Sequence, residues 1–287
     1  MANEAAVTEK EILGAPYVRS STAPLRDAVL VAPGASLDRL VPLQGESSPI
    51  VSRAKEQHAI LVRTLHDHGV RMHPLEELDD TGLATFVGDC AMVVEGGAIL
   101  LRPHKIERRR EVAAVQTKLE QLGVPIIGKI EAPGLIDGGD VVVVGGTAYV
   151  GVPRTGPRSN SLGRDQLSRI LASCGLRTVE LAMEATIPRL NDVFSGVADD
   201  LVVAAADFVD TAPLQGKANV VAIPRGDEYG ASLLALAPRT VIANLRFAMA
   251  LPILRKAKLN VVAIDLWEFG KVGGGPPSLV LPLKRGA

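Results

Sequence analysis

The chain has 287 residues, of which 47% are hydrophobic and 22% charged, so it can bury a large core in one big domain or two small ones. Its 31 Lys plus Arg and 32 Asp plus Glu leave a net charge of −1, which gives no global attraction to nucleic acid or to an anionic membrane. With no basic and apolar leader and no apolar run of about 18 residues, we expect a cytoplasmic protein outside the membrane. The two cysteines and five histidines show no zinc spacing, so we expect neither a metal nor a cofactor.

The predicted elements recur in one order along the chain: an apolar hairpin, a helix that ends at a glycine, and an extended run. Apolar residues at helical spacing predict helices that end at Gly69, Gly123 and Gly175 and lead into extended runs at 70–75, 124–130 and 176–181. Paired glycines predict hairpins over 91–101 and 141–150, with weaker copies over 193–203 and 233–243. A fourth helix, over 251–257, leads into 260–266 without the glycine.

Four or five such units give a period near 55 to 60 residues, too long for most helical solenoids. Units that cannot bury their own faces must pack together, and five would close into a ring around a central pocket. We therefore predict an α/β fold with five ββαβ blades, formed by a single domain over 21–287 after an N-terminal segment over 1–20. A generic two-layer α/β fold is the alternative. No glycine-rich nucleotide fingerprint follows any strand.

Several short motifs, in order, resemble those of the pentein or guanidino-group-modifying superfamily, in particular dimethylarginine dimethylaminohydrolase and the arginine deiminases. The similar segments are Phe86-Val87-Gly88-Asp89, Arg108-Arg109 with Glu111, Asp137-Gly138-Gly139-Asp140, Arg158-Ser159-Asn160 and Gly273-Gly274-Gly275. The resemblance implies a five-bladed propeller with its active site on the axis, and a cysteine nucleophile assisted by a histidine.

Both of those catalytic groups are replaced in this chain. The resemblance places Ser278 at the position of the cysteine and Arg189 at the position of the histidine. A serine hydroxyl needs an adjacent base, and an arginine with a pKa above about 12 cannot serve as one. Covalent catalysis of the family type is therefore not expected.

The polar residues that remain suggest a different chemistry. The resemblance implies substrate-binding roles for Asp89, Arg109 and Arg158, and catalytic positions for Asp137, Arg189 and Ser278. An arginine at the histidine position would repel a guanidinium, so a neutral or anionic substrate fits better. In one scheme Asp137 directs water onto an electron-poor sp2 carbon and Arg189 stabilises an anionic leaving group, as the denitration of a 2-nitroimidazole would require.

Each of these residues also has a structural interpretation. Asp137 and Arg189 could form a buried remnant ion pair, and Ser278 could be an inert packed residue. Cys90 could reach the pocket as a nucleophile, although it is expected to face away from Asp89. The sequence leaves open whether Arg154 or Arg158 faces the pocket, and the local trio His66, His68 and His73 is expected at the surface.

Three functions follow from this set. The chain is a cysteine-independent hydrolase of a carbon–nitrogen bond in a small planar compound, a catalytically inactive relative that binds a ligand or regulates a partner, or a structural subunit. The retained charges favour the first two, because burying them without a ligand is costly. We expect a small-molecule substrate and no nucleic-acid partner, and we leave open whether the protein forms a homo-oligomer.

Overall fold

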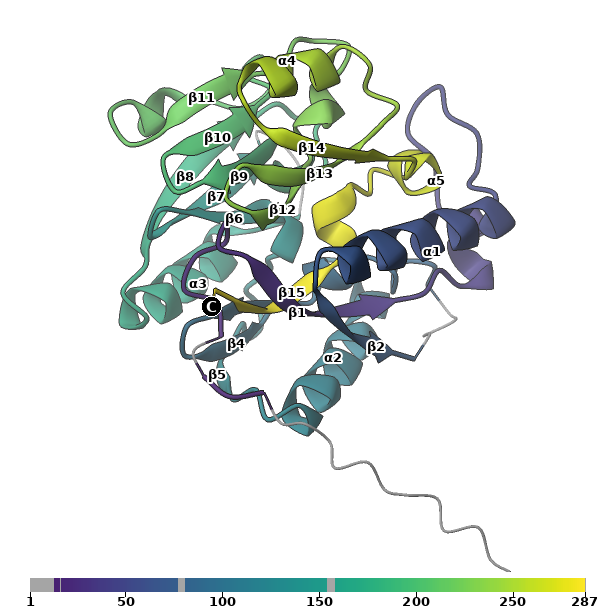
Figure 1. The fold of residues 1–287 in the computed structure, drawn as a ribbon. Coiled ribbons are helices and arrows are strands. Elements are labelled where there is room, and N and C mark those ends of the chain that lie inside the picture. Colours follow the sequence, from purple (N-terminus) through teal and green to yellow (C-terminus); the bar gives the residue numbers. More distant parts are fainter. Residues whose placement is uncertain (1–12, 16, 77–80, 154–157, 287) are drawn as a thin grey trace, which may run out of the picture.

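The computed structural model describes residues 13–15, 17–76, 81–153 and 158–286, so positions 1–12 and 16 of the predicted N-terminal segment lie outside the described residues. Within these ranges the strands form five separate three-stranded sheets, arranged as blades (Figure 1). In every blade the middle strand runs antiparallel to the inner strand and parallel to the outer one. The predicted five-bladed α/β architecture is confirmed.

The first blade joins the two ends of the chain. Its inner strand is the last of the chain, β15 (Leu281–Arg285), which pairs with β1 (Leu25–Val31), beside β2 (Arg71–Leu75) (Figure 1). In the order inner, middle, outer, the other blades are β3 (Ala91–Val94), β4 (Gly97–Leu100) and β5 (Ile126–Lys129); β6 (Val141–Val144), β7 (Thr147–Pro153) and β8 (Arg177–Met183); β9 (Phe194–Ala198), β10 (Leu201–Ala204) and β11 (Asn219–Ala222); and β12 (Leu234–Ala237), β13 (Thr240–Asn244) and β14 (Asn260–Ile264).

Helices connect the middle strand to the outer strand in four blades: α1 (Val51–Asp67), α2 (Arg109–Gln121), α3 (Ser161–Ser173) and α4 (Ala250–Lys256). The first three end at the predicted glycines, which have φ of 74°, 73° and 78°. After α4 the residue with the left-handed backbone conformation is Lys258, with φ of 61°, because the chain has no glycine at this position. The fourth blade has a 3-10 turn, η6 (Ala212–Leu214), in place of a helix, in line with its weaker sequence pattern.

The blades are held together by hydrophobic contacts at their junctions. In the described part of the chain, five clusters of buried apolar side chains each join two neighbouring blades. For example, Leu100 of the second blade packs in one cluster with Val31 and Leu281 of the first. Burial of apolar area is the main stabilising contribution, so a blade has no core of its own without its neighbours.

A short helix, α5 (Trp267–Gly270), follows the last blade and precedes the glycine-rich segment. Over the described residues, no helix has the length and apolarity that crossing a membrane requires.

Candidate active site

A ring of 3-10 turns closes the axis of the propeller. One turn precedes each inner strand: η2 (Val87–Asp89), η4 (Gly138–Asp140), η5 (Leu190–Asp192), η7 (Glu228–Ala231) and η8 (Pro276–Leu279). The turns approach one another closely, and a Cβ atom added at Gly138 would meet the carbonyl oxygen of Gly88. A polar pocket lies among the loops that lead into these turns.

Asp89 is the centre of a buried ion-pair network in this pocket. Its Oδ2 accepts hydrogen bonds from Nη1 of Arg108 at 2.7 Å and from Nη1 of Arg189 at 3.1 Å. Its Oδ1 accepts from the backbone N–H of Gly139 at 3.1 Å. Burial alone would raise the pKa of Asp89, but Arg189 and Arg108 outweigh it and hold the pKa below its usual range. The carboxylate is therefore ionised and already fully partnered by the protein.

Arg189 is held on three sides. Besides Asp89, it donates through Nε to Oδ2 of Asp192 at 3.3 Å, and its guanidinium carbon lies 5.6 Å from the ring centroid of Phe86. The predicted remnant pair between Asp137 and Arg189 is not formed, because Arg189 pairs with Asp89 of another turn and with Asp192 of its own turn.

Asp137 forms the second polar group, with a histidine to which the sequence assigned no role, His104. Nδ1 of His104 lies 3.0 Å from Oδ2 of Asp137, and Nη2 of Arg158 donates to the same oxygen at 3.2 Å. In the tautomer that donates from Nδ1 to this carboxylate oxygen, Nε2 of the ring is an acceptor. His104, Asp137 and Arg158 all line the pocket, and Oδ1 of Asp137 is buried without a partner among the described residues.

Two of the turns each end in a further buried carboxyl group, Asp140 in η4 and Asp192 in η5. Burial raises the pKa of Asp140 to about 7, although Arg158 partly offsets it. Burial likewise raises the pKa of Asp192 to about 6, against the opposing effect of Arg189. Oδ2 of Asp140 and Oδ1 of Asp192 have no hydrogen-bond partner among the described residues. These two groups therefore hold protons more strongly than ordinary carboxyl groups.

Ser278 lies in η8, outside the polar pocket. It is fully buried, and its Oγ accepts from Nδ2 of Asn191 at 3.3 Å. In the described structure no histidine or carboxylate bonds to this hydroxyl, so it has no neighbouring base that would activate it as a nucleophile.

Arg108 is the arginine of the second blade that lines the pocket. The prediction that Arg109 binds the substrate is therefore wrong. Arg109 is the first residue of α2 and is exposed, whereas Arg108 is buried in the preceding turn, η3 (Ile106–Arg108). Besides Asp89, Arg108 binds Oε2 of Glu111 through Nε at 2.7 Å. The i,i+3 spacing to Glu111 is the signal that could have separated Arg108 from its neighbours.

Cys90 is buried behind this network. Its Sγ lies 3.7 Å from Oε2 of Glu111 and 3.8 Å from Nη2 of Arg108. Burial raises the pKa of the thiol far above its ordinary value, and Arg108 only partly opposes this. A thiol without thiolate character and without access is not a nucleophile.

The structure also bears on the two candidate pocket arginines, Arg154 and Arg158, and on the remaining histidines. Arg154 lies outside the described residues, whereas Arg158 does face the pocket. The remaining histidines contribute nothing to the site; His73, for example, contacts Asp27 at 2.9 Å. Across the described ranges, no group of three or more His, Cys, Asp or Glu side chains is suited to hold a metal ion.

The fold and the pocket can be compared with known proteins. No family model matches the chain. It is 28% identical over 232 residues to N(G),N(G)-dimethylarginine dimethylaminohydrolase of Streptomyces coelicolor, which covers 81% of this chain and 86% of that protein. The solved structure of this enzyme (DDAH) from Pseudomonas aeruginosa, a Cys-to-Ser mutant complexed with citrulline, has a TM-score of 0.81 at 25% identity and covers 90% of this chain and 99% of its own.

The N-terminal domain of a cyanobacterial arginine dihydrolase, bound to substrate, has the same fold at only 17% identity, with a TM-score of 0.78 over 91% of this chain and 98% of its own. The chain thus has the pentein fold of these proteins and is similar in sequence to DDAH.

Proposed function

We propose that the protein hydrolyses a carbon–nitrogen bond in a small planar compound by direct attack of water. The observation that carries the proposal is the contact of 3.0 Å between Nδ1 of His104 and Oδ2 of Asp137 in the wall of the pocket. A carboxylate that orients an imidazole in this way supports general-base catalysis, because it fixes the tautomer and stabilises the imidazolium that forms. This pair would take over the task that a cysteine and a histidine perform in the family enzymes.

In the proposed reaction, water adds to an electron-poor sp2 carbon while its proton passes to Nε2 of His104. The carbon–nitrogen bond then breaks, and the nitrogen group leaves with the bonding electron pair as an anion or, after protonation by His104, as an amine. Arg158, which contacts the same carboxylate oxygen as His104, stands next to the base and would stabilise negative charge in the transition state. Arg189 would contribute positive charge from the adjacent turn.

The charges of the pocket favour a neutral or anionic substrate. Its wall carries four cationic side chains, Lys105, Arg108, Arg158 and Arg189, against the two carboxylates of Asp89 and Asp137. Both oxygens of Asp89 already accept hydrogen bonds from the protein, so an incoming guanidinium would have to displace an arginine. A 2-nitroimidazole is one instance of the class: water replaces the nitro group, and nitrite departs with a proton left for solvent.

A turnover screen tests this proposal. Nitrite and ammonia release is measured for 2-nitroimidazole, for related planar nitro and amino heterocycles, and for arginine and dimethylarginine. We expect release from a neutral or anionic heterocycle, with kcat lowered about 100-fold or more in His104→Gln and in Asp137→Asn. The exposed Arg109→Gln is the matched control on the same loop-to-helix segment and should retain activity.

The same screen distinguishes attack by water from attack by the hydroxyl of Ser278. Ser278→Ala should keep the wild-type rate, since nothing in the described structure activates that hydroxyl. A wild-type rate in His104→Gln, or loss of activity in a folded Ser278→Ala protein, would overturn the water-attack scheme.

A second candidate function is ligand binding without turnover. It is favoured by Asp89, because both of its carboxylate oxygens already accept hydrogen bonds from the protein. The pocket would then serve recognition alone. In that case the purified protein releases neither nitrite nor ammonia from any compound of the panel, yet one or more of them raises its melting temperature in a concentration-dependent way.

A further inference from the structure

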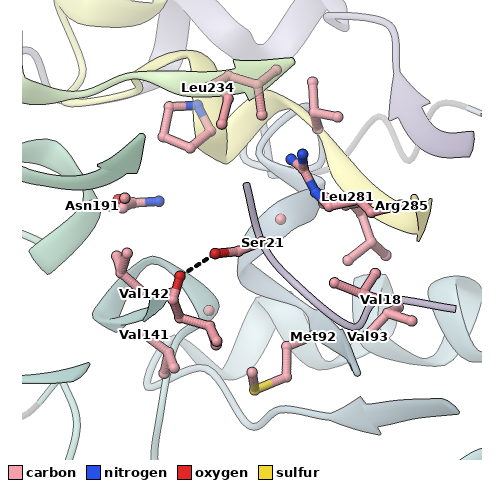
Figure 2. A pocket seen from close by; sticks show the side chains of 18 of the residues that line it. Val18, Ser21, Met92, Val93, Val141, Val142, Asn191, Leu234, Leu281 and Arg285 are labelled. Carbon is pink, nitrogen blue, oxygen red and sulfur yellow. Dashed lines mark hydrogen bonds between the residues drawn. The ribbon is translucent and has the colours of Figure 1, made fainter. Parts of the chain in front are cut away.

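A second chamber lies on the propeller axis, and the proposed chemistry does not use it. It is lined by the inner strands, for example by Met92 of β3, Val142 of β6 and Leu234 of β12 (Figure 2). Gly88 and Gly138 of the turn ring also line it. Its cavity volume is about 170 Å³. The polar pocket contains none of these inner-strand residues, so the two cavities are separate.

The N-terminal segment crosses this chamber at the hairpin ends of the blades. Tyr17 donates its backbone N–H to the carbonyl oxygen of Glu95 at 3.4 Å, and Thr22 donates through Oγ1 to Oδ1 of Asp199 at 2.7 Å. Between these anchors, Ser21 donates to the carbonyl oxygen of Val143 across the opening (Figure 2). The segment therefore partly covers the chamber and limits it to small molecules.

The charges of this chamber have one sign. Among the described residues that line it there is no aspartate, glutamate or lysine, and the charged side chains are Arg19 and Arg285. Arg19 is two-thirds exposed and pairs with Glu95 at 2.7 Å, so its charge is balanced at the surface. Arg285 is different, because it is buried and its guanidinium points into the chamber (Figure 2).

In the described structure, the side chain of Arg285 has a single hydrogen bond, from Nη1 to the carbonyl oxygen of Ala23 at 2.8 Å, and no carboxylate partner. Burial lowers its pKa to about 9, the result expected of a cation that no carboxylate balances. A buried charge without a partner is costly, and an anion that entered the chamber would remove that cost. The planar fork of a guanidinium matches a carboxylate in a bidentate pair.

We propose that this chamber binds a small amphipathic monocarboxylate, with its carboxylate paired to Arg285 and its apolar body packed against the inner strands. A carboxylate suits the site better than a phosphate, because the rest of the chamber wall is largely apolar and offers few further donors. This site is independent of the proposed hydrolysis in the other pocket.

Octanoate is a suitable probe, with octanol and octylamine as neutral and cationic counterparts of the same length. In calorimetric titrations of the full chain, octanoate should bind one to one, and octanol and octylamine should bind about tenfold more weakly or not at all. Absence of saturable octanoate binding, or equal binding of octylamine, overturns the proposal.

Substitutions of single residues test whether octanoate binds in this chamber. Arg285→Gln should weaken octanoate binding about tenfold or more, whereas Arg26→Gln, an exposed arginine on the paired strand β1, should leave it within about twofold. Val142→Phe, which fills the chamber without touching a charge, should weaken binding to a similar extent and serves as the test if Arg285→Gln does not fold. Unchanged octanoate affinity in either folded chamber variant refutes the assignment.

Discussion

Asp140 offers the sharpest test of the electrostatics around the turn ring. Its carboxyl group is buried, its Oδ2 has no partner among the described residues, and burial raises its pKa from 3.8 to about 7. Between these values the folded protein holds a proton that the unfolded chain has released. Its contribution therefore makes the free energy of unfolding fall as pH rises, by about 1.4 kcal/mol per pH unit. Over about three units the loss is about 4 kcal/mol.

Asp140→Asn removes this titration and keeps the size of the side chain. The variant should be about as stable as the wild type near pH 4 and more stable by up to about 4 kcal/mol at pH 8. Urea unfolding at half-unit steps between pH 4 and pH 8 measures the difference. Asp200→Asn, in the exposed turn between β9 and β10, is the matched control and should follow the wild-type curve. An Asp140→Asn variant with the wild-type pH dependence, or with lower stability at pH 8, would show that Asp140 is ionised and well paired in the folded protein.

Three further predictions concern the same region. Arg108→Gln leaves Asp89 with one fewer cation in a buried site and should lower the free energy of unfolding by about 3–5 kcal/mol, measured by urea unfolding at pH 7; a loss below about 1 kcal/mol would contradict the buried network. Gly138→Ala should destabilise by about 1–3 kcal/mol, because its Cβ would meet the backbone carbonyl of Gly88, and an unchanged melting temperature would contradict this close approach of the turns. In the native protein Cys90 should resist a thiol-specific reagent that modifies the half-buried second cysteine, with both reacting after denaturation; rapid native labelling of Cys90 would contradict its burial and raised pKa.

The fold could be predicted further than the site. Repeated hairpins and helix-ending glycines are local signals, so Gly69, Gly123 and Gly175 marked the units correctly. The ring followed because units of this size cannot bury their faces alone. The fourth blade was harder to predict, because the segment that connects its middle and outer strands has no helical periodicity.

Site residues depend on contacts that no local pattern encodes. In a run of three arginines, hydrophobic periodicity does not decide which one turns inward, and the structure selects Arg108 because it precedes the helix that Arg109 begins. His104 lies in a loop with no repeating pattern, and it contacts Asp137 only when the second and third blades come together. The raised pKa of Asp140 likewise arises from burial, which depends on the whole ring.

The pairing of β1 with β15 has a consequence for biosynthesis. Residues 25–31 are synthesised long before residues 281–285, which form the strand that completes their sheet. During translation one edge of β1 therefore stays unpaired until β15 has been synthesised, and an unpaired strand edge is open to misassociation. Loss of residues 281–285 would thus remove the inner strand of the first blade and open the ring at that blade.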